Sequence, residues 1–346
     1  MTTRILPTDE LAQFNSAVAE AVAQLSAGEV VALPTETVYG LAANALDASA
    51  VAKIFETKER PSFDPLIVHL PHRSDLETVA NVPADIADAV DKIVRKFWPG
   101  PLTLVLPKKE CIPDIVTAGL PTVAVRVSSE PVFVRVVRSF GKPLAAPSAN
   151  RFGSISPTSA SAVKAELDGR ISLILDGGAS NHGIESTIIK VEAGPDKPII
   201  SILRPGPITH DDLKEFGIVK HAFKKAAREG AAAEAPGMTA SHYAPRTPLR
   251  LLSSPEEFTP EEGKKYALLS YRGEPGDGYI DLADWEGMHI LTPGKGKLVE
   301  AACRLFYAMR ELDRLGVDEI IAEPVPEQGV GMAVMDRLRR ASAKRA

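Results

Sequence analysis

The stretch ETKERPSFDPLIVHL, residues 56–70, joins the end of a predicted helix to a short buried strand. Lys58 and Arg60 close the helical pattern, a proline turn follows, and the apolar run ends in His69. A helix that leads through a turn into a buried strand is a building unit of α/β proteins. The two cations at the turn indicate either a solvated helix end or a site for an anion.

Helical and strand patterns continue on both sides of this stretch. Apolar spacing predicts a helix over residues 10–27, ended by Gly28, and another over 50–58 with Ser49 as its N-cap. Residues 34–47 are predicted to turn. Further helices are expected at residues 84–97 and 132–140, and strands at 30–33, 66–70, 102–106, 123–127, 171–175, 188–191 and 199–203. Because loops as well as helices join these strands, we expect an α/β domain with a twisted mixed sheet.

The composition changes after Phe216, where Ala, Gly, Pro and charged residues replace the apolar runs. This pattern predicts a linker over residues 217–247 between a first domain, 1–216, and a smaller one, 248–346. In the second domain, strands are expected at 249–252, 266–270 and 320–322, and helices at 298–315 and 330–343. Alternation of strand and helix favours a small, Rossmann-like, doubly wound parallel sheet.

The overall composition excludes several classes of protein. Of 346 residues, 45% are hydrophobic and 25% are charged, which is ordinary for a globular protein. A net charge of −5 argues against a protein built to bind nucleic acid. Cys111 and Cys303 form no disulfide framework or metal spacing, and no apolar run approaches 18 residues. We therefore expect a cytoplasmic protein without a signal peptide or membrane segment.

The sequence also lacks the common catalytic motifs. It has no GxxxxGK[ST] loop, no GxGxxG after a strand, no HExxH or CxxC pair and no GxSxG elbow. Any nucleotide chemistry must therefore use a less common phosphate site.

Polar residues cluster instead at the ends of predicted strands. Thr35, Thr37 and Tyr39 follow the first buried strand, at a position where α/β sheets tend to bind ligands, although turn formation explains them equally well. Lys58 and Arg60 suit phosphate, the Arg as a bidentate donor, but exposed cations more often pair with surface acids. A histidine at the end of an apolar run, such as His69, is more often a core residue with its hydrogen bonds satisfied than a residue that contacts a ligand.

Two further stretches share this pattern. Arg126 ends a buried strand, where a cation needs a carboxylate, a phosphate or solvent. Ser148 and Asn150 lie among Ala, Pro and Gly, where either an Asx-type turn or a ligand accounts for them. Ser186 opens one strand and Arg204 closes another. The set binds anions and lacks an activated nucleophile, which suits the positioning of two substrates in nucleotidyl transfer.

On these motifs the chain resembles the two-domain threonylcarbamoyl-AMP synthases, which combine a YrdC-like domain with a small C-terminal domain. The matching stretches, in order, are PTETVYGL, the K-x-R of Lys58 and Arg60, DPLIVH, WPGPLTLVL, TAGLPTVAVR, the S-x-N of Ser148 and Asn150, ESTII, LRPGP and HYAP. They span residues 34–245, about two-thirds of the chain.

The resemblance implies a transferase that makes threonylcarbamoyl-AMP and pyrophosphate from ATP, L-threonine and bicarbonate. This is the first step of threonylcarbamoyladenosine modification next to the tRNA anticodon. It implies Mg²⁺ bridged by the ATP phosphates, no protein metal ligands and no organic cofactor. Proteins that transfer the threonylcarbamoyl group to tRNA would act downstream, and the enzyme itself needs no nucleic-acid contact.

The resemblance also implies two sets of site residues. Lys58 and Arg60 would be catalytic. The expected ATP site consists of Lys58, Arg60, Ser62, Thr122, Ser148, Asn150, Ser156, Arg204 and Tyr243. The expected L-threonine site consists of Thr35, Thr37, Tyr39, His69, Arg126 and Ser186, with Arg126 as the partner of the substrate carboxylate.

Two details and two rival functions accompany this reading. Glu59, where the family often has Ser, Thr or Asn, should point to solvent. The linker, with Tyr243, would act either as a lid over the active site or as a spacer. The rivals are an RNA-binding module, which the acidic charge disfavours, and a carbamoyl transferase, whose acylphosphatase and zinc-finger segments this chain lacks.

Overall fold

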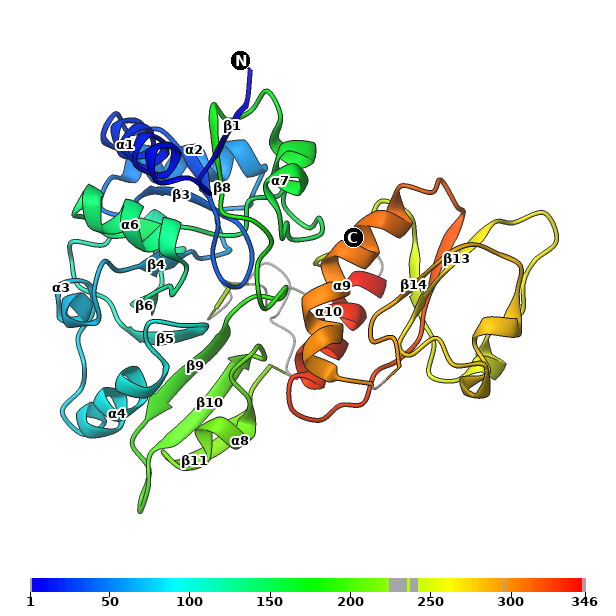
Figure 1. Ribbon diagram of the computed structural model, residues 1–346. Helices are drawn as coiled ribbons and strands as arrows, with labels where there is room; N and C mark the ends of the chain where they lie inside the picture. Colours follow the sequence, from blue (N-terminus) through cyan, green and yellow to red (C-terminus); the bar gives the residue numbers. More distant parts are fainter. Residues whose placement is uncertain (1, 224–234, 237–241, 295, 344–346) are drawn as a thin grey trace. The chain divides into compact units, whose positions relative to one another are not determined.

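The computed structural model describes residues 2–223, 235–236, 242–294 and 296–343 (Figure 1). They divide into two compact units. The first contains the described residues within 1–152, 157–181 and 185–239, and the second those within 153–156, 182–184 and 240–346. Two short segments, 153–156 and 182–184, therefore belong to the second unit although they interrupt the first unit in the sequence.

The first unit is built on one mixed sheet of eleven strands. In spatial order these are β1 (Arg4–Pro7), β8 (Leu173–Asp176), β2 (Val31–Leu33), β3 (Gly40–Asn44), β7 (Leu144–Ala145), β4 (Ile67–His69), β6 (Thr122–Arg126), β5 (Leu102–Pro107), β9 (Thr187–Glu192), β10 (Ile199–Arg204) and β11 (Ile218–His221). Strand β4 pairs with β6 in parallel, whereas β7 and β5 pair antiparallel with their neighbours β4 and β6. The predicted mixed α/β fold is confirmed.

Helices surround this sheet. They are α1 (Leu11–Ser26), α2 (Ala48–Lys58), α3 (Leu76–Val79), α4 (Ala87–Phe97), α5 (Asp114–Thr117), α6 (Pro131–Phe140), α7 (Ala160–Leu167) and α8 (His210–Leu213). Helices α1 and α6 lie side by side in Figure 1, and their apolar faces share one core with β2 and β8. In α1 that face is Ala17, Val18, Ala21 and Leu25, a spacing of i, i+1, i+4 and i+8 that places these residues on one side of the helix.

Local signals define α6. The Glu130 carboxylate accepts a hydrogen bond from the Phe133 N–H, Pro131 occupies the first turn, and Gly141 ends the helix at φ 72°. These are an N-cap, a favoured first-turn proline and a left-handed C-terminal glycine. The sequence-predicted helix at 132–140 is confirmed.

The structure corrects two local predictions. The N-cap of α2 is Asp47, which accepts hydrogen bonds from the backbone N–H groups of Ser49 and Ala50, so Ser49 is not the cap. Residues 40–44, predicted as part of a turn, form β3. The predicted linker begins with β11, which pairs in parallel with β10, and residues 224–234 and 237–241 lie outside the described residues.

The second unit contains a parallel sheet of four strands in the order β12 (Leu249–Leu251), β15 (Glu319–Ala322), β13 (Tyr266–Ser270) and β14 (Trp285–Ile290). Helices α9 (Leu298–Asp313) and α10 (Gly331–Ser342) contact each other and the sheet. Phe258, which lies between β12 and β13, and Tyr279, which lies between β13 and β14, pack in one apolar cluster with Tyr266 and Leu268 of β13. The small parallel α/β domain predicted for this region is confirmed.

Among the described residues, no helix is both long and apolar enough to span a membrane.

Candidate functional site

The turn after α2 directs two cations into the first unit. Glu59 ends the helix in the left-handed conformation, at φ 54°, with its side chain 60% exposed and paired with Arg170 at 2.7 Å. Its neighbours Lys58 and Arg60 are buried. The prediction that Glu59 faces solvent is confirmed, and the reversal at Glu59 lets both cations point inward.

Lys58 contacts the S-x-N stretch. Its ammonium donates hydrogen bonds to the carbonyl oxygens of Ser148 and Asn150, each at 2.5 Å. Burial, and then the charge of Arg60, hold the pKa of Lys58 well below its usual value. Two of the three ammonium donors therefore bind backbone, and an anion beside the third would favour the charged form.

Arg60 is held by the DPLIVH stretch. Its guanidinium forms an ion pair with the fully buried Asp64 at 2.9 Å and donates to the carbonyl oxygens of Asp64 and Pro65. Asp64, which sequence reasoning did not include in the site, thus orients Arg60. The signal was its place four residues after the arginine.

A second buried ion pair lies under the PTETVYGL loop. Arg126 Nη2 is 2.7 Å from Glu36 Oε1, and Arg126 Nη1 donates to Thr37 Oγ1 at 3.0 Å. The hydroxyl of Ser128 donates to the other carboxylate oxygen of Glu36 at 2.5 Å. Burial alone would raise the pKa of Glu36, but Arg126 and Ser128 outweigh it and lower the pKa to about 2.

The Thr35 hydroxyl braces this loop through Thr37 Oγ1 at 2.8 Å and the Val38 carbonyl at 2.6 Å. The sequence allowed a carboxylate, a phosphate or solvent as the partner of Arg126, and in the structure the partner is the carboxylate of Glu36. Glu36 and Ser128 were missed as site residues, although both flank predicted ones.

His69 is the registered neighbour of Arg126 on the adjacent parallel strand. It is 2% exposed, and its ring centroid lies 4.7 Å from that of Phe133. Burial, and then the charge of Arg126, lower the pKa of His69 to about 3. The ring is therefore neutral at physiological pH. Its Nδ1 atom has no hydrogen-bond partner among the residues that the structure describes.

Ser186 and Arg204, assigned from sequence to different substrates, are in direct contact. Arg204 donates to the Ser186 hydroxyl and carbonyl oxygens, each at 3.0 Å, and to the Pro236 carbonyl at 3.3 Å. The Ser186 hydroxyl also lies 2.8 Å from Thr103 Oγ1. Ser186 therefore belongs structurally with Arg204, and Thr103 is a further member that sequence reasoning missed.

Tyr39 is buried, and its hydroxyl donates to the Gly178 carbonyl at 2.7 Å and to Asp176 at 3.3 Å. Burial and then Asp176 raise the pKa of Tyr39. Its backbone carbonyl accepts from the Ala149 N–H at 2.8 Å, which ties the PTETVYGL loop to the S-x-N stretch.

The remaining predicted residues are placed differently. Ser62 is exposed. Thr122 begins β6 and Arg126 ends it, so the two lie roughly 13 Å apart along the strand. Ser156 and Tyr243 are buried residues of the second unit.

Within the first unit, three groups of predicted residues are therefore brought together. The first is Lys58 with Ser148 and Asn150, the second is Thr35 and Thr37 with Arg126, and the third is Ser186 with Arg204. All three combine a buried cation with hydroxyl or amide groups, which can bind anionic and zwitterionic ligands. In the described part of the chain, no three His, Cys, Asp or Glu side chains are grouped to hold a metal ion.

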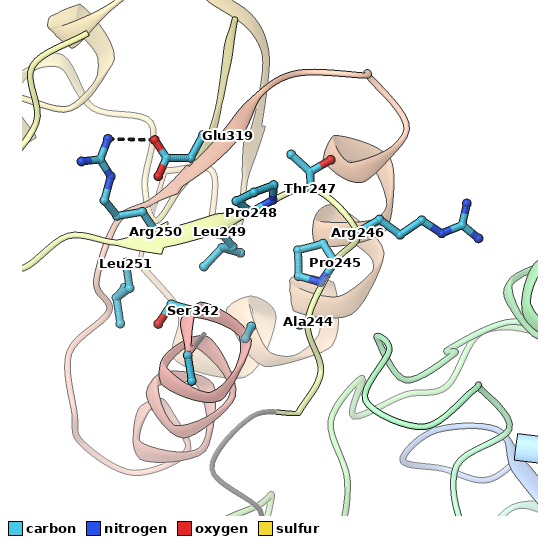
Figure 2. A pocket seen from close by; sticks show the side chains of 12 residues that line it. Ala244, Pro245, Arg246, Thr247, Pro248, Leu249, Arg250, Leu251, Glu319 and Ser342 are labelled. Atoms are coloured by element: carbon cyan, nitrogen blue, oxygen red, sulfur yellow. Dashed lines mark hydrogen bonds and ion pairs between the residues drawn. The ribbon is translucent and has the colours of Figure 1, made fainter. Parts of the chain in front are cut away.

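A cavity of about 550 Å³ lies in the second unit, lined by β12, the start of β15 and the end of α10 (Figure 2). Arg250 and Glu319 form a 2.8 Å ion pair beside it, and Arg246 points away from the other labelled side chains. None of the twelve lining residues belongs to the predicted site.

Comparison with known proteins finds two family models that match successive parts of the chain. A family model for Sua5, YciO and YrdC proteins, described as telomere recombination, matches residues 23–206. A model described as the C-terminal domain of threonylcarbamoyl-AMP synthase matches residues 208–343.

Whole-chain relatives are also found. A threonylcarbamoyl-AMP synthase of Pyrococcus abyssi is 40% identical over 92% of both chains. One of Bacillus subtilis is 40% identical over 98% of this chain and 96% of its own. The crystal structure of P. abyssi Sua5 complexed with L-threonine superposes with a TM-score of 0.83 at 37% identity, covering 98% of each chain.

Fold and site together define a two-domain α/β protein with a YrdC-like first unit. The chain belongs to the threonylcarbamoyl-AMP synthase family.

Proposed function

We infer that the protein is a nucleotidyltransferase that makes L-threonylcarbamoyl-AMP from L-threonine, bicarbonate and ATP and releases pyrophosphate. The observation that carries this inference is the 40% identity to a threonylcarbamoyl-AMP synthase over nearly the full length of both chains. The reaction is the first step of threonylcarbamoyladenosine modification of tRNA. We expect the protein to act in the cytoplasm, upstream of proteins that transfer the group to tRNA.

The chemistry has two steps. The amine of threonine adds to the carbon of bicarbonate with loss of water, which gives a carbamate. A carbamate oxygen then attacks the α-phosphorus of ATP, and the bond to the β-phosphate breaks with release of pyrophosphate. No covalent enzyme intermediate is needed, so the protein contributes positioning and charge neutralisation.

Lys58 and Arg60 would neutralise the triphosphate. Both are buried and held by backbone or by Asp64, so they are oriented before a ligand arrives. Ser148 and Asn150 would line the nucleotide, and Ser62, Thr122, Ser156, Arg204 and Tyr243 complete the proposed ATP set. Mg²⁺, bound to the phosphates of ATP, would supply further neutralisation without protein ligands.

Arg126 would bind the threonine carboxylate, and Thr35, Thr37, Tyr39, His69 and Ser186 the rest of that substrate. Because its guanidinium already contacts Glu36, Thr37 and the Gly100 carbonyl, a substrate carboxylate must share or displace one of these contacts. A neutral His69 can accept a hydrogen bond from the substrate amine.

The test is pyrophosphate release from ATP by the purified protein, with threonine and bicarbonate each omitted in turn. Release should require both and should be lost when serine replaces threonine. Release that ignores both would show an ATP-consuming protein of another kind. No release from folded protein supplied with Mg²⁺ would move the weight to the RNA-binding alternative.

A further inference from the structure

The second unit has a cavity that the proposed reaction does not use. It measures about 510 Å³ and is lined by Tyr271, Arg272, Asp277, Gly296 and the segment 323–326. Apart from Gly296, which follows β14, these residues follow β13 and β15, which are neighbouring parallel strands. The chain leaves β13 toward β14 on one side, whereas α10, the helix that follows β15, packs against β12 on the other side. The cavity thus lies at the carboxyl ends of the strands at a topological switch point, where open α/β sheets bind ligands.

A buried carboxylate lines this cavity. Glu323 is 4% exposed, and its Oε2 atom accepts hydrogen bonds from the Ser270 hydroxyl and the Tyr271 N–H, each at 2.8 Å. Its Oε1 atom has no hydrogen-bond partner among the residues that the structure describes. Burial raises the pKa of the Glu323 carboxyl, so a positive group beside it would stabilise its ionised form.

A guanidinium lines the same cavity. Arg272 donates through Nε and Nη2 to the two carboxylate oxygens of Asp277, at 3.2 and 2.6 Å. The Asp277 carboxylate therefore fixes the plane of the guanidinium, and Glu274 adds an ion pair to Nη2 at 3.2 Å. Nη1 has no partner among the residues that the structure describes.

Hydrogen bonds also hold Tyr271, which lines the same cavity as Glu323 and Arg272. The Tyr271 hydroxyl donates to the Gly296 carbonyl at 2.7 Å, and the Tyr271 carbonyl accepts from Thr292. Pro324, Val325 and Pro326 provide apolar surface. The cavity thus presents the Oε1 atom of Glu323, the Nη1 edge of Arg272 and an apolar surface. Hydrogen bonds hold both charged groups in place.

We propose that this cavity binds a free α-amino acid, with its ammonium on Glu323, its carboxylate on Arg272 and its side chain on Val325 and the flanking prolines. A lone cation would leave the Arg272 edge unused, and a lone anion would face the Glu323 carboxylate. A zwitterion satisfies both charges, and the volume falls within the range of small-molecule sites. The site is separate from the proposed threonine site, whose residues belong to the first unit.

The experiment follows the methyl NMR signals of Val325 in the full chain with labelled valine methyl groups, assigned with Val325→Ile. The probes are the twenty L-amino acids one at a time, then isobutylamine, which is valine without its carboxylate, and isovalerate, which is valine without its ammonium. At least one amino acid should shift the Val325 signals in a saturable manner, and neither isobutylamine nor isovalerate should do so at the same concentration.

Glu323→Gln is the diagnostic variant, because the amide oxygen can still accept from Ser270 and Tyr271 while the charge is lost. It should weaken binding by about tenfold or more, since a charge-assisted hydrogen bond is removed. Glu286→Gln, an exposed residue of β14, is the matched control and should bind as the parent does.

Three outcomes would overturn the proposal: no amino acid shifts the Val325 signals, isobutylamine or isovalerate shifts them as strongly, or Glu323→Gln binds unchanged. Each leaves the proposed synthesis intact, because pyrophosphate release is measured separately on the same protein.

Discussion

At the scale of the residue, Arg126 is a buried cation whose charge the chain itself balances. Removing two charges from water costs several kcal/mol, and the ion pair offsets this only when further hydrogen bonds satisfy both groups. Thr37, Ser128 and the Gly100 carbonyl supply those bonds. The pair therefore holds the loop at residues 34–38 in place before any substrate binds.

The pH dependence of stability tests this pair. The pKa of Glu36 is lowered from 4.5 to about 2 on folding, so its contribution is complete above pH 4.5 and is lost as pH falls toward 2. The free energy of unfolding of the parent, relative to Glu36→Gln, should shrink by on the order of 3 kcal/mol over that window. Urea titrations from pH 6 downward, in steps of about half a unit, measure it. Glu59→Gln is the exposed control. A difference independent of pH would contradict the pairing.

The proposed role of Lys58 can be tested by measuring the activity and the stability of a variant. Lys58→Ala should lower the turnover of pyrophosphate release by about 100-fold or more, as loss of a preorganised charge does. It should also cost about 1–3 kcal/mol of stability, because the Ser148 and Asn150 carbonyls lose their donor. Lys53→Ala, on the same helix but exposed and paired with Glu29, should change neither. Unchanged turnover in a folded Lys58→Ala protein would remove Lys58 from the ATP site.

At the scale of the element, α2 depends on both of its ends. Its C-terminal end at Glu59 sets the direction of Lys58 and Arg60, and its N-terminal end sets where the helix begins. An N-cap side chain satisfies backbone N–H groups that have no partner within the helix.

The identity of the N-cap can be measured. Asp47→Ala should lower the free energy of unfolding by about 1 kcal/mol, because it removes the acceptor for the Ser49 and Ala50 N–H groups. Ser49→Ala should change it by less than about 0.5 kcal/mol. Urea denaturation followed by circular dichroism compares the two. Equal losses would show that the Ser49 side chain contributes to the cap after all.

Elements with strong periodicity were predictable from sequence, and short ones were not. The helix at residues 11–26 repeats its apolar face over four turns, and the strand at 102–107 is an apolar run that only Thr103 interrupts. By contrast, β3 lies within a stretch of small residues, GLAAN, that has no period. Strand β7 has two residues, too few to carry any pattern. Such strands exist because neighbouring strands supply their hydrogen bonds.

The candidate site shows the same limit. The motifs indicated Lys58, Arg60 and Arg126, because a cation next to a predicted buried strand needs a carboxylate, a phosphate or solvent as its partner. Of the acids that hold two of them, Asp64 stands only four residues after Arg60, whereas Glu36 could not be paired from sequence, since 90 residues separate it from Arg126. The contact between Ser186 and Arg204 likewise depends on the pairing of β9 with β10.

At the scale of the whole molecule, the second unit includes residues that the linear order assigns to the first. Gly183 lies against helix α9: a Cβ at this position would be 2.5 Å from Cys303 Cα. No local pattern announces such a contact, because it depends on a segment more than 100 residues away.

Gly183→Ala tests that packing. Gly183 and Gly178 both have positive φ angles, 69° and 82°, so alanine carries similar backbone strain at each. Only at 183 does the added methyl group meet other backbone, whereas at 178 nothing lies within 4 Å. Gly183→Ala should therefore cost about 1–3 kcal/mol more than Gly178→Ala. Thermal unfolding of the full chain compares them, and equal losses would refute close packing of residues 182–184 on α9.

The pairing of β1 with β8 has a consequence for synthesis on the ribosome. Residues 4–7 can find their partner only after residues 173–176 have been made. At about 5–20 residues per second, the first strand waits on the order of 10–30 s after its own synthesis. During that time its neighbours in the sheet are incomplete, so the nascent chain has an open edge that a chaperone could cover.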